Sequence, residues 1–454
     1  MEPQVLTDIL HEVAGALDHR DVAAVLHAAG RAAPAERGSL LLALTPPQLS
    51  ALFRLIGQEP ASDLLEEIAP ADAARLLVRL SETEAGAILE GMDPDDAVDV
   101  VQELAPSRAE EILHHVSRDA ARELLELLPY DPDTAGGIMT PELVAVRPEA
   151  TVQEALAALR DLAQQVEPGS IQYIYVADEA RRLVGVLPLR ALVLSRPQVP
   201  VSEVMLTDIV KVRAGADQEA AARLLLEHDL MALPVVDDEE RLVGIITADD
   251  ALDVLQEETS EDIARLGGSE PLDQPYLRAS AAHIVRRRLG WVLLLFVLGN
   301  FTSLVIRHFE ASIEAMVSLT LFIPLLIGMG GVVGTQTVTT LVRSLALGEV
   351  APRHIVRVLR KELVVATVLG ITLGLANTAL AWLFGVPIEV RYTIGLTAFL
   401  LPFWAVSVAV VLPLLTHRLG IDPAVISNPL LTNIVDWTGL LLYFSLAQWL
   451  VFGR

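Results

Sequence analysis

A single carboxylate interrupts the last apolar segment of the chain. Asp436 lies in the sequence SNPLLTNIVDWTGLLLYF, and Asn428 and Thr432 precede it at intervals of four residues. In a helix this spacing places the three side chains along one flank. Oxygen ligands suit hard cations such as Mg²⁺, which gives up its bound water reluctantly. The three residues therefore predict a site for a largely hydrated cation; a carboxylate that is hydrogen-bonded inside a helix bundle is the structural alternative.

A second set of polar residues lies in another apolar segment, which reads GMGGVVGTQTVTT. Its glycines let helix backbones approach closely, and Gln336 and the neighbouring threonines supply oxygen atoms. Glu362 opens the next apolar segment, either as a residue of a cation pathway or as an acid that complements the positive end of a helix dipole. The predicted ion-binding residues of a pore are thus Asp436, Asn428, Thr432, Gln336 and Glu362.

A run of acidic residues precedes these apolar segments, in the sequence TADDALDVLQEETSEDIARLGG. A spacing of three to four residues places four of the acids on one helical face. These are Asp250, Asp253, Glu257 and Glu261. Like charges at this spacing destabilise a helix unless cations offset them. The run either forms a solvated surface or belongs to a helix that moves when cations bind.

The first two sets of residues must be held by membrane-spanning helices. Four long stretches carry no charged residue, and a fifth is interrupted only by Asp436. They cover residues 289–306, 315–342, 363–388, 392–416 and 423–453. A bilayer core of about 30 Å needs about 20 apolar residues of helix. The sequence therefore predicts an α-helical transmembrane bundle of five helices within residues 283–454.

Charge is distributed unevenly along the 454 residues. The formal net charge is −26, which argues against a nucleic-acid partner because phosphate binding needs a basic surface. Residues 1–280 carry 52 acidic and 21 basic residues, whereas residues 281–454 carry 7 and 12. The chain has no cysteine, which excludes disulfides, thiolate nucleophiles and cysteine-based metal sites.

Basic residues next to the apolar segments predict their orientation. They cluster before the first segment and between the second and third, at Arg286, Arg287, Arg288, Arg343, Arg353, Arg357, Arg360 and Lys361. Fewer basic residues lie at the opposite ends, among them Arg307 and Arg391. Because Lys and Arg favour the cytoplasmic side, we expect a multi-pass protein of the plasma or inner membrane, with a cytoplasmic acidic half and the C-terminus outside. The N-terminus lacks the apolar run of a signal peptide, which agrees.

A repeat of 12 residues runs through residues 1–130. Apolar residues recur at this interval from Leu44 to Leu128. Prolines recur near the start of several units, at Pro46, Pro70, Pro94 and Pro106. Each unit predicts a short amphipathic helix that begins at or near proline, and such units bury their apolar faces by stacking. We therefore expect an all-α superhelical N-terminal domain with an acidic surface.

Residues 138–200 and 201–255 contain two copies of one pattern, in which Met139 corresponds to Met205 and LVGV to LVGI. Each copy predicts strand, helix, strand, turn, strand and helix. The pair resembles tandem CBS domains, an α/β module that often binds adenine nucleotides such as ATP. The resemblance implies a ribose contact at Gly244, Thr247 and Asp250. The first copy has Pro188 and Ala191 at the corresponding places, so at most one site of this kind is complete.

The whole order of segments resembles the MgtE family of magnesium channels or transporters: an acidic helical domain, two CBS domains, an acidic connecting helix at residues 250–280 and five spans. The most specific matches are IPLLIGMGGVVGTQ, RSLALGE and the block from Asn428 to Asp436. The resemblance implies a homodimer in which Asp436 meets hydrated Mg²⁺ and cytoplasmic Mg²⁺ closes the pore by bridging acids. The predicted metal-binding residues are Asp95, Asp229, Asp250, Asp253, Glu257, Glu258, Glu261, Asp262 and Asp436.

One position departs from the family pattern. Val332 stands where GGNxGxQ has Asn, so an amide oxygen is lost and we expect weaker ion coordination or altered selectivity. Two alternatives stay open: an H⁺- or Na⁺-coupled secondary transporter of divalent cations, and a CBS-regulated channel for another ion. An anion channel is disfavoured by the pore acid. An enzyme is not expected, because the sequence has neither a Walker-type loop nor an HExxH motif.

Overall fold

The structure is a computed structural model that describes residues 12, 13, 15, 19, 34–162, 172–272, 274, 276–277, 279–346, 348–419 and 426–453. The chain divides into two compact units, Met1–Glu258 and Thr259–Arg454, which we call the acidic unit and the membrane unit. The fold class that the sequence predicts is confirmed, with a helical N-terminal part, a CBS pair and a bundle of apolar helices.

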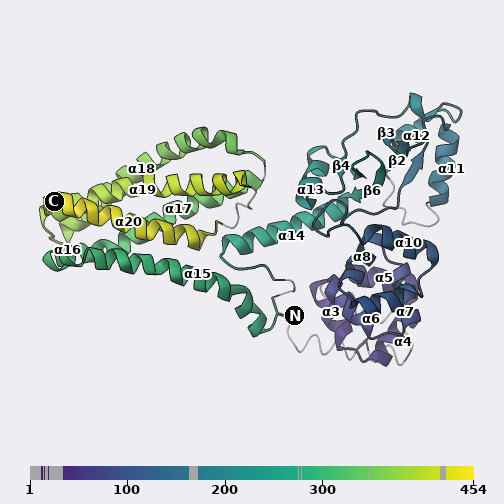
Figure 1. The fold of residues 1–454 in the computed structure, drawn as a ribbon, viewed down its shortest axis with the longest axis horizontal. Coiled ribbons are helices and arrows are strands. Elements are labelled where there is room, and N and C mark those ends of the chain that lie inside the picture. The colour runs from purple at the N-terminus through teal and green to yellow at the C-terminus, as the bar shows by residue number, and fades with distance from the viewer. Residues whose placement is uncertain are drawn as a thin grey trace. The chain divides into compact units, whose positions relative to one another are not determined.

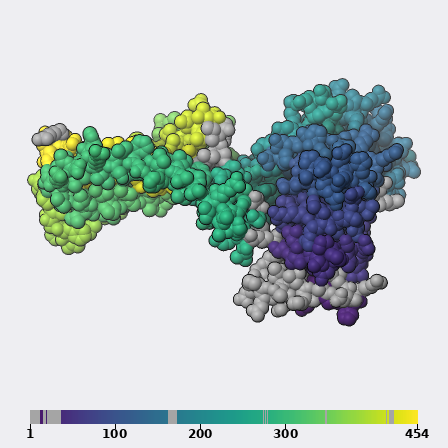
Figure 2. Space-filling model, turned by 60° about the horizontal axis from the view of Figure 1, so that its bottom comes forward, coloured from purple at the N-terminus to yellow at the C-terminus, as the bar shows by residue number. Residues whose placement is uncertain are grey.

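Short helices build the N-terminal part of the acidic unit. They are α3 (Pro34–Ala43), α4 (Pro46–Ile56), α5 (Gln58–Glu66), α6 (Pro70–Val78), α7 (Glu82–Glu90), α8 (Pro94–Gln102), α9 (Pro106–Leu113) and α10 (Arg118–Leu127). The prolines of the repeat open α4, α6, α8 and α9, whereas Ser81 and Ser117 cap the starts of α7 and α10. In the space-filling view the colour passes in order from purple to blue across this part, as expected for stacked repeats (Figure 2).

The 12-residue periodicity marks the core of this stack. Leu44, Leu80 and Leu104 of the repeat are buried, as are the corresponding apolar residues between them. Arginines join neighbouring helices: Arg79 donates to the backbone oxygen of Leu42 at 2.7 Å, and Arg108 donates to that of Leu80 at 3.0 Å. These bonds satisfy carbonyl groups near helix ends, which have no partner within their own helix.

The two CBS copies follow the predicted order of elements. The first contains β1 (Val144–Val146), α11 (Val152–Leu162), β2 (Tyr173–Ala177), β3 (Leu183–Pro188) and α12 (Leu189–Leu194). The second contains a 3₁₀ turn at Val201–Glu203, then β4 (Val212–Arg213), α13 (Gln218–Glu227), β5 (Ala232–Val236), β6 (Leu242–Thr247) and α14 (Ala248–Leu266). In each sheet the first two strands are parallel and the last two antiparallel.

The predicted correspondence between the copies is confirmed by how they exchange contacts. Met139 packs on Gly244 of β6, where a Cβ atom would lie 2.7 Å from the methionine sulfur, and Met205 packs on Gly185 of β3. Thr140 exchanges two backbone hydrogen bonds with Ile245, just as Val186 does with Leu206. Each copy therefore supplies a segment that completes the other, and the pair folds as one module.

Among the described residues, five helices are long and apolar enough to cross a membrane, as predicted. The helices of this unit are α15 (Ala281–His308), α16 (Glu310–Ala315), α17 (Ile323–Ala346), α18 (Ile355–Leu383), α19 (Ile388–Arg418) and α20 (Asn428–Leu450). Two 3₁₀ turns, Val317–Phe322 and Pro352–His354, precede α17 and α18. Figure 1 shows α17, α18, α19 and α20 running alongside one another, with α15 at one edge of the group.

Small residues allow the helices of this unit to pack closely. A Cβ atom at Gly370 of α18 would lie 2.5 Å from the backbone oxygen of Phe399 in α19, and one at Gly374 would lie 3.0 Å from that of Gly395. Helix α14 ends at Leu266 instead of continuing toward residue 280, because Gly268 has a φ of +73°. Glycine adopts this left-handed conformation without a steric penalty, and it is a common helix terminator.

Candidate cation sites

Helices α17 and α20 approach closely in the middle of the membrane unit because glycines of α17 face α20. A Cβ atom at Gly331 would lie 2.9 Å from Cγ2 of Thr432, and one at Gly330 would lie 2.9 Å from Cγ1 of Val435. The glycine-rich segment that the sequence analysis singled out is therefore a helix contact. Its polar residues are brought beside those of α20.

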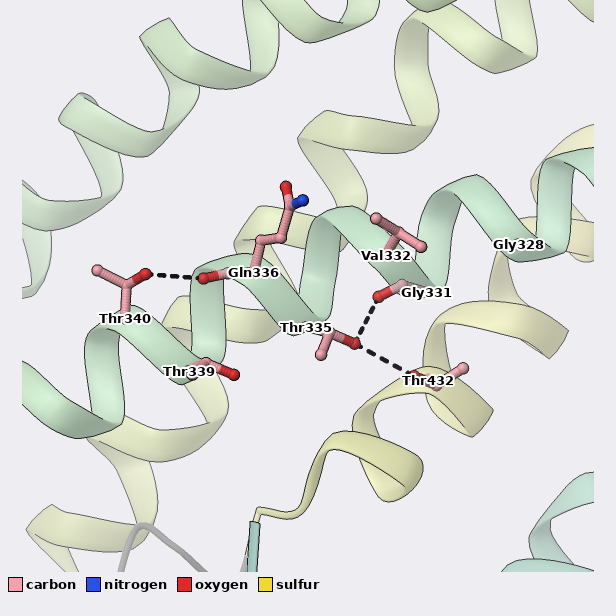
Figure 3. Close-up of a pocket in the computed structure, with 8 residues that line it drawn as sticks. All are labelled: Gly328, Gly331, Val332, Thr335, Gln336, Thr339, Thr340 and Thr432. Atoms are coloured by element: carbon pink, nitrogen blue, oxygen red, sulfur yellow. Dashed lines mark hydrogen bonds between the residues drawn. The ribbon is translucent and has the colours of Figure 1, made fainter. Parts of the chain in front are cut away.

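A groove of about 540 Å³ follows this contact (Figure 3). It is lined by Gly328, Gly331, Val332, Thr335, Gln336, Thr339, Thr340 and Thr432. Thr335 Oγ1 donates to the backbone oxygen of Gly331 at 2.7 Å and lies 3.5 Å from Thr432 Oγ1. Thr339 Oγ1 donates to Oδ1 of Asn428 at 3.3 Å. The groove thus offers a row of hydroxyl and amide oxygens without a carboxylate.

The side chain of Val332 is the apolar exception in this lining. It is 56% exposed, whereas Val333 beside it is buried. Figure 3 shows the Val332 methyl groups one helical turn from Gln336, whose amide points away from Thr432. The side chain of Val332 therefore interrupts the polar lining of the groove.

Asp436 follows Thr432 by one turn of α20 but does not line the groove. Its Oδ1 atom is buried and accepts no hydrogen bond from the described residues. A buried carboxylate oxygen without a donor is costly in a membrane unless a cation, a proton or water compensates it. Asn428, Thr432 and Gln336 therefore lie at the groove, and Asp436 lies farther along the same helix.

Glu362 occupies a different place from the other four predicted pore residues. Its Oε2 atom accepts a hydrogen bond of 3.3 Å from Thr337 of α17. The side chain of Thr337 is buried. Thr337 is not part of the groove lining. The structure thus places Glu362 in hydrogen-bond contact with α17, outside the groove.

The C-terminal end of α14 rests on the start of α20. A Cβ atom at Gly268 would lie 3.2 Å from Cγ of Pro429 and 3.6 Å from Oγ of Ser427. Ser427 is fully buried and caps α20 by accepting from the backbone nitrogen of Leu430 at 3.3 Å. Leu266 packs against the apolar cluster that contains Leu431 and Val435. The last turn of the acidic helix is therefore fixed to the helix that carries Asp436.

A second cavity, of about 350 Å³, lies within the acidic unit. Its acidic lining comes mainly from α8 and α14: Asp95, Asp96, Asp99, Glu103, Asp133, Asp250, Asp253 and Glu257. Gln218 and backbone atoms near Gly137 and Ile138 complete it. We call this cavity the acidic pocket.

Burial and mutual repulsion raise the pKa values of these acids. Burial raises the pKa of Asp95 well above its usual range, and the charge of Asp250 raises it further. Burial raises the pKa of Asp96 to about 8, with Glu66 the largest charged contributor. The pKa of Asp99 is raised to about 6 by burial and by Glu257. Such carboxylates need protons or cations to stay together in a folded chain.

Asp250 is held by a neighbour in the same turn. Burial raises its pKa to about 6, although a hydrogen bond from Thr247 opposes the shift. Asp250 and Thr247, together with Gly244, form the predicted ribose contact. Gly244 is covered by Met139, and Thr247 is buried with its hydroxyl bonded to Asp250. Asp250 therefore belongs to the acidic pocket as well as to the predicted nucleotide contact.

Three acids at the edge of this region could hold one ion together. Oxygen atoms of Glu66, Asp93 and Asp96 all lie within 4.8 Å of one another. Burial and neighbouring acids, Asp93 the largest contributor among them, raise the pKa of Glu142 to about 7. The sequence analysis named only Asp95 in α8 as a metal ligand. The useful signal was the dense run of acids in DPDDAVD, which is the most acidic unit of the repeat.

The other predicted metal-binding residues lie outside the acidic pocket. Asp229 is exposed just after α13 with a φ of +52°. Glu258 accepts a hydrogen bond of 2.9 Å from Gln218, and Glu261 pairs with Arg265 on α14. Asp262 is half-buried on the same helix. The structure thus brings together Asp95, Asp250, Asp253 and Glu257, and leaves these four elsewhere.

Family models match the helical N-terminal part, the CBS pair and the membrane helices from α17 onward. The MgtE family, described as divalent cation transporters, matches residues 323–446, the MgtE intracellular N domain matches residues 32–133, and CBS domains match residues 135–196 and 201–257. The magnesium transporter MgtE of Thermus thermophilus is 43% identical over 322 residues, which cover 71% of each chain. The chain belongs to the MgtE family.

Further matches to MgtE proteins include a second curated relative and a solved structure. The magnesium transporter MgtE of Bacillus subtilis is 32% identical over 71% of this chain and 70% of its own. Among solved structures, the cytosolic domain of the Mg²⁺ channel MgtE in complex with ATP is 37% identical and covers 54% of this chain and 99% of that chain, with a TM-score of 0.48. As an MgtE family member with five apolar helices, the protein is a multi-pass membrane protein.

Proposed function

We propose that this protein carries Mg²⁺ across the cell membrane through the groove between α17 and α20. Relatives named magnesium transporters support the ion, and the groove supports the route. The observation that carries the proposal is the row of hydroxyl and amide oxygens that ends near an unpartnered carboxylate, Asp436. This order of ligands suits an ion that keeps most of its water.

The groove and the carboxylate have different tasks in this proposal. Neutral oxygens of Thr335, Thr432 and Asn428 accept hydrogen bonds from the water shell of the ion without binding the ion itself tightly. Asp436 supplies the negative charge that offsets the loss of bulk water in the membrane. Binding is then strong enough to admit a divalent cation and weak enough to release it.

We further propose that Mg²⁺ in the cytoplasm closes this route through the acidic pocket. Without cations, the carboxylates of α8 and α14 repel one another; burial is the main cause of the raised pKa values of Asp96 and Asp99, and the charges of Asp250 and Glu257 on α14 add to it. Mg²⁺ bound there favours the compact arrangement because its affinity for that arrangement is higher. Helix α14 ends at Leu266, and Gly268 just after it contacts Pro429, so a change in the position of α14 is passed to α20.

The assembly and orientation follow from the same proposal. The protein is a homodimer whose acidic unit lies in the cytoplasm and whose C-terminus lies outside. Basic residues support this orientation because they gather at the ends of the spans nearest the acidic unit in sequence, such as Arg288 and Arg360. We also propose that the CBS pair binds an adenine nucleotide, which the bonded pair Thr247 and Asp250 at the end of β6 supports.

A flux assay tests the main proposal. The full chain is reconstituted into liposomes that contain a fluorescent Mg²⁺ indicator, and uptake is followed with and without an imposed proton or sodium gradient. We expect uptake that follows the Mg²⁺ gradient alone. Uptake that requires either gradient would instead support a coupled transporter, and absence of uptake for every divalent cation would contradict the proposal.

The nucleotide proposal needs its own measurement. Thr247→Val removes the hydroxyl that bonds Asp250 but preserves the shape of the side chain. We expect weaker ATP binding by calorimetry with the full chain in detergent. Pro188→Ala, at the corresponding place in the first copy, serves as the control and should leave ATP binding unchanged.

A further inference from the structure

Helix α18 carries an exposed stripe that none of the proposed functions uses. At intervals of three or four residues, and after a final interval of seven, it presents first basic and then apolar side chains. In order these are Arg357, Arg360, Val364, Val368, Ile371, Leu375 and Trp382, with Lys361 beside Arg360. The apolar members are between 49% and 69% exposed. The stripe thus changes from positive to apolar along a single face.

The opposite face of α18 fixes the direction of this stripe. Ala366, Gly370 and Asn377 are buried, and glycines of this face pack against α19. At the start of the helix, Ile355 and Leu359 pack against an apolar cluster from α17 and α19. The basic residues therefore point away from the protein core, toward the surroundings of the membrane unit.

Distances along the helix match a bilayer. With a rise of 1.5 Å per residue, Lys361 and Trp382 lie about 32 Å apart along the axis. The hydrocarbon core of a bilayer is about 30 Å thick, and exposed tryptophan is typical of its interface. When Trp382 lies at one interface, Arg357, Arg360 and Lys361 reach the headgroups of the other leaflet.

Among the described residues, the charge at this end has no acidic partner. No carboxylate of the described residues pairs with Arg357, Arg360 or Lys361, and Glu362, the sole acid in the α18 sequence, bonds Thr337 instead. These cations occupy the first two turns of α18, where the helix dipole disfavours positive charge. Like charges three or four residues apart repel one another as well. An anion at this position would relieve both effects.

We propose that the basic end of this stripe binds the headgroups of anionic phospholipids, while the apolar part lies against their acyl chains. The combination of three cations with a lipid-facing stripe selects a lipid phosphate rather than a free phosphate. The bound lipid stabilises the start of α18, next to the hydrogen bond between Glu362 and Thr337. This inference does not depend on which ion the protein carries.

Native mass spectrometry of the full chain in detergent tests the proposal. Phosphatidylglycerol is the anionic probe and phosphatidylcholine the zwitterionic one. The triple variant Arg357→Gln, Arg360→Gln and Lys361→Gln is compared with a control that loses three exposed cations of the acidic unit, Arg118→Gln, Arg160→Gln and Arg190→Gln. Each cation near an anionic surface contributes about a fivefold factor, so we expect the first variant to bind phosphatidylglycerol roughly 100-fold more weakly.

Two further arms make the result decisive. For the wild-type protein, raising the salt concentration should weaken phosphatidylglycerol binding and leave phosphatidylcholine binding unchanged, which needs no variant to fold. Inorganic phosphate at equal concentration should not displace the lipid. Equal binding by the triple variant and the wild type, an equal loss in the control, salt-independent binding, or displacement by inorganic phosphate would each overturn the proposal.

Discussion

The acidic pocket and the groove between α17 and α20 differ in the charge of the residues that line them. The pocket gathers eight carboxylates from distant parts of the acidic unit into about 350 Å³. The groove, about 540 Å³ in volume, is lined by neutral oxygens and one valine, with a single carboxylate beyond it. Dense charge makes an arrangement sensitive to whether cations are present, whereas sparse charge lets an ion enter and leave.

This difference teaches how one ion can have two effects on one protein. In the pocket, burial and repulsion between acids such as Asp95 and Asp250 disfavour the charged carboxylates, and we propose that bound Mg²⁺ offsets this cost. In the groove the ion meets little charge until it reaches Asp436. The pocket is therefore suited to sense Mg²⁺ and the groove to pass it.

Asp436→Asn should have the largest effect, because it removes the carboxylate of the proposed ion route. We expect flux to fall to the level of empty liposomes while the protein still folds. Glu389→Gln removes an exposed acid elsewhere in the membrane unit and should retain flux. If Asp436→Asn kept wild-type flux, this carboxylate would not belong to the proposed route, and the contrast between the two sites would fail.

Substitutions in the acidic pocket should leave transport intact and remove its control. In Asp95→Asn combined with Asp250→Asn, we expect the Mg²⁺ concentration for half-inhibition to rise about 10- to 100-fold, the range of typical coupling free energies. Flux is measured with free Mg²⁺ set on the side that carries the acidic unit. Glu110→Gln with Glu149→Gln removes two exposed acids and is the matched control. Equal inhibition curves for all three proteins would contradict a sensing role.

The pH dependence of stability should expose the repulsion directly. Folding raises the pKa of Asp96 from its usual value to about 8, so the folded state holds this proton more tightly than the unfolded state. Stability from this group is complete below the unfolded pKa and declines as the pH rises toward about 8. Without divalent cations, we expect calorimetric melting of the acidic unit in the full chain to be lower at pH 8 than at about pH 6.

One variant and one ion test whether the raised pKa of Asp96 causes this pH dependence. Asp96→Asn should flatten the pH dependence and raise stability at pH 8 by about 1 to 2 kcal/mol. Excess Mg²⁺ should produce the same flattening in the wild-type protein, since the cation replaces the proton. A pH dependence that neither change alters would show that the acids of the pocket are not its source.

Much of the fold could be predicted because the relevant signals are local. The 12-residue repeat marked the buried positions of the stack, and the charge-free runs marked the five long helices. The correspondence between Met139 and Met205 could be recognised by aligning the two copies. The end of α14 carried its own signal in Gly267 and Gly268, although the sequence analysis extended the acidic connecting segment to residue 280.

The composition of the sites was harder to predict because it depends on long-range packing. Asp96 and Asp99 meet Asp250 only when α8 and α14 pack together, and no local pattern encodes that contact. Glu362 had two interpretations from sequence, and its hydrogen bond with Thr337 turns it away from the groove. Sequence therefore identified the residue types of each site better than their partners.

The contact between α14 and α20 should have a moderate effect on control. Gly268→Ala places a methyl group 3.2 Å from the Pro429 ring and strains a backbone with a φ of +73°, which costs about 1 to 2 kcal/mol. We expect saturating Mg²⁺ to inhibit this variant less completely, with unchanged flux at low Mg²⁺. Gly267→Ala, which meets only α14, is the control.

Two companion variants identify the cause of that change. Gly268→Asn adds a side chain but tolerates the left-handed conformation, so it tests the contact with less backbone strain. Pro429→Ala removes the ring atoms that the new methyl group would meet and should restore part of the inhibition in Gly268→Ala. If Gly267→Ala had the same effect, the contact with α20 would not be the route of control.

The smallest expected effect concerns the apolar interruption of the groove. Val332→Asn adds an amide beside Thr335 and Gln336, where it can accept a hydrogen bond from the water shell of the ion. One such bond contributes about 1 kcal/mol, so we expect the apparent affinity for Mg²⁺ in the flux assay to rise about fivefold. Val332→Leu changes size without adding oxygen and should leave affinity unchanged. Equal affinities in both variants would mean that ions pass the groove without relying on the polar atoms at this position, and the division between a sensing pocket and a passing groove would then rest on Asp436 alone.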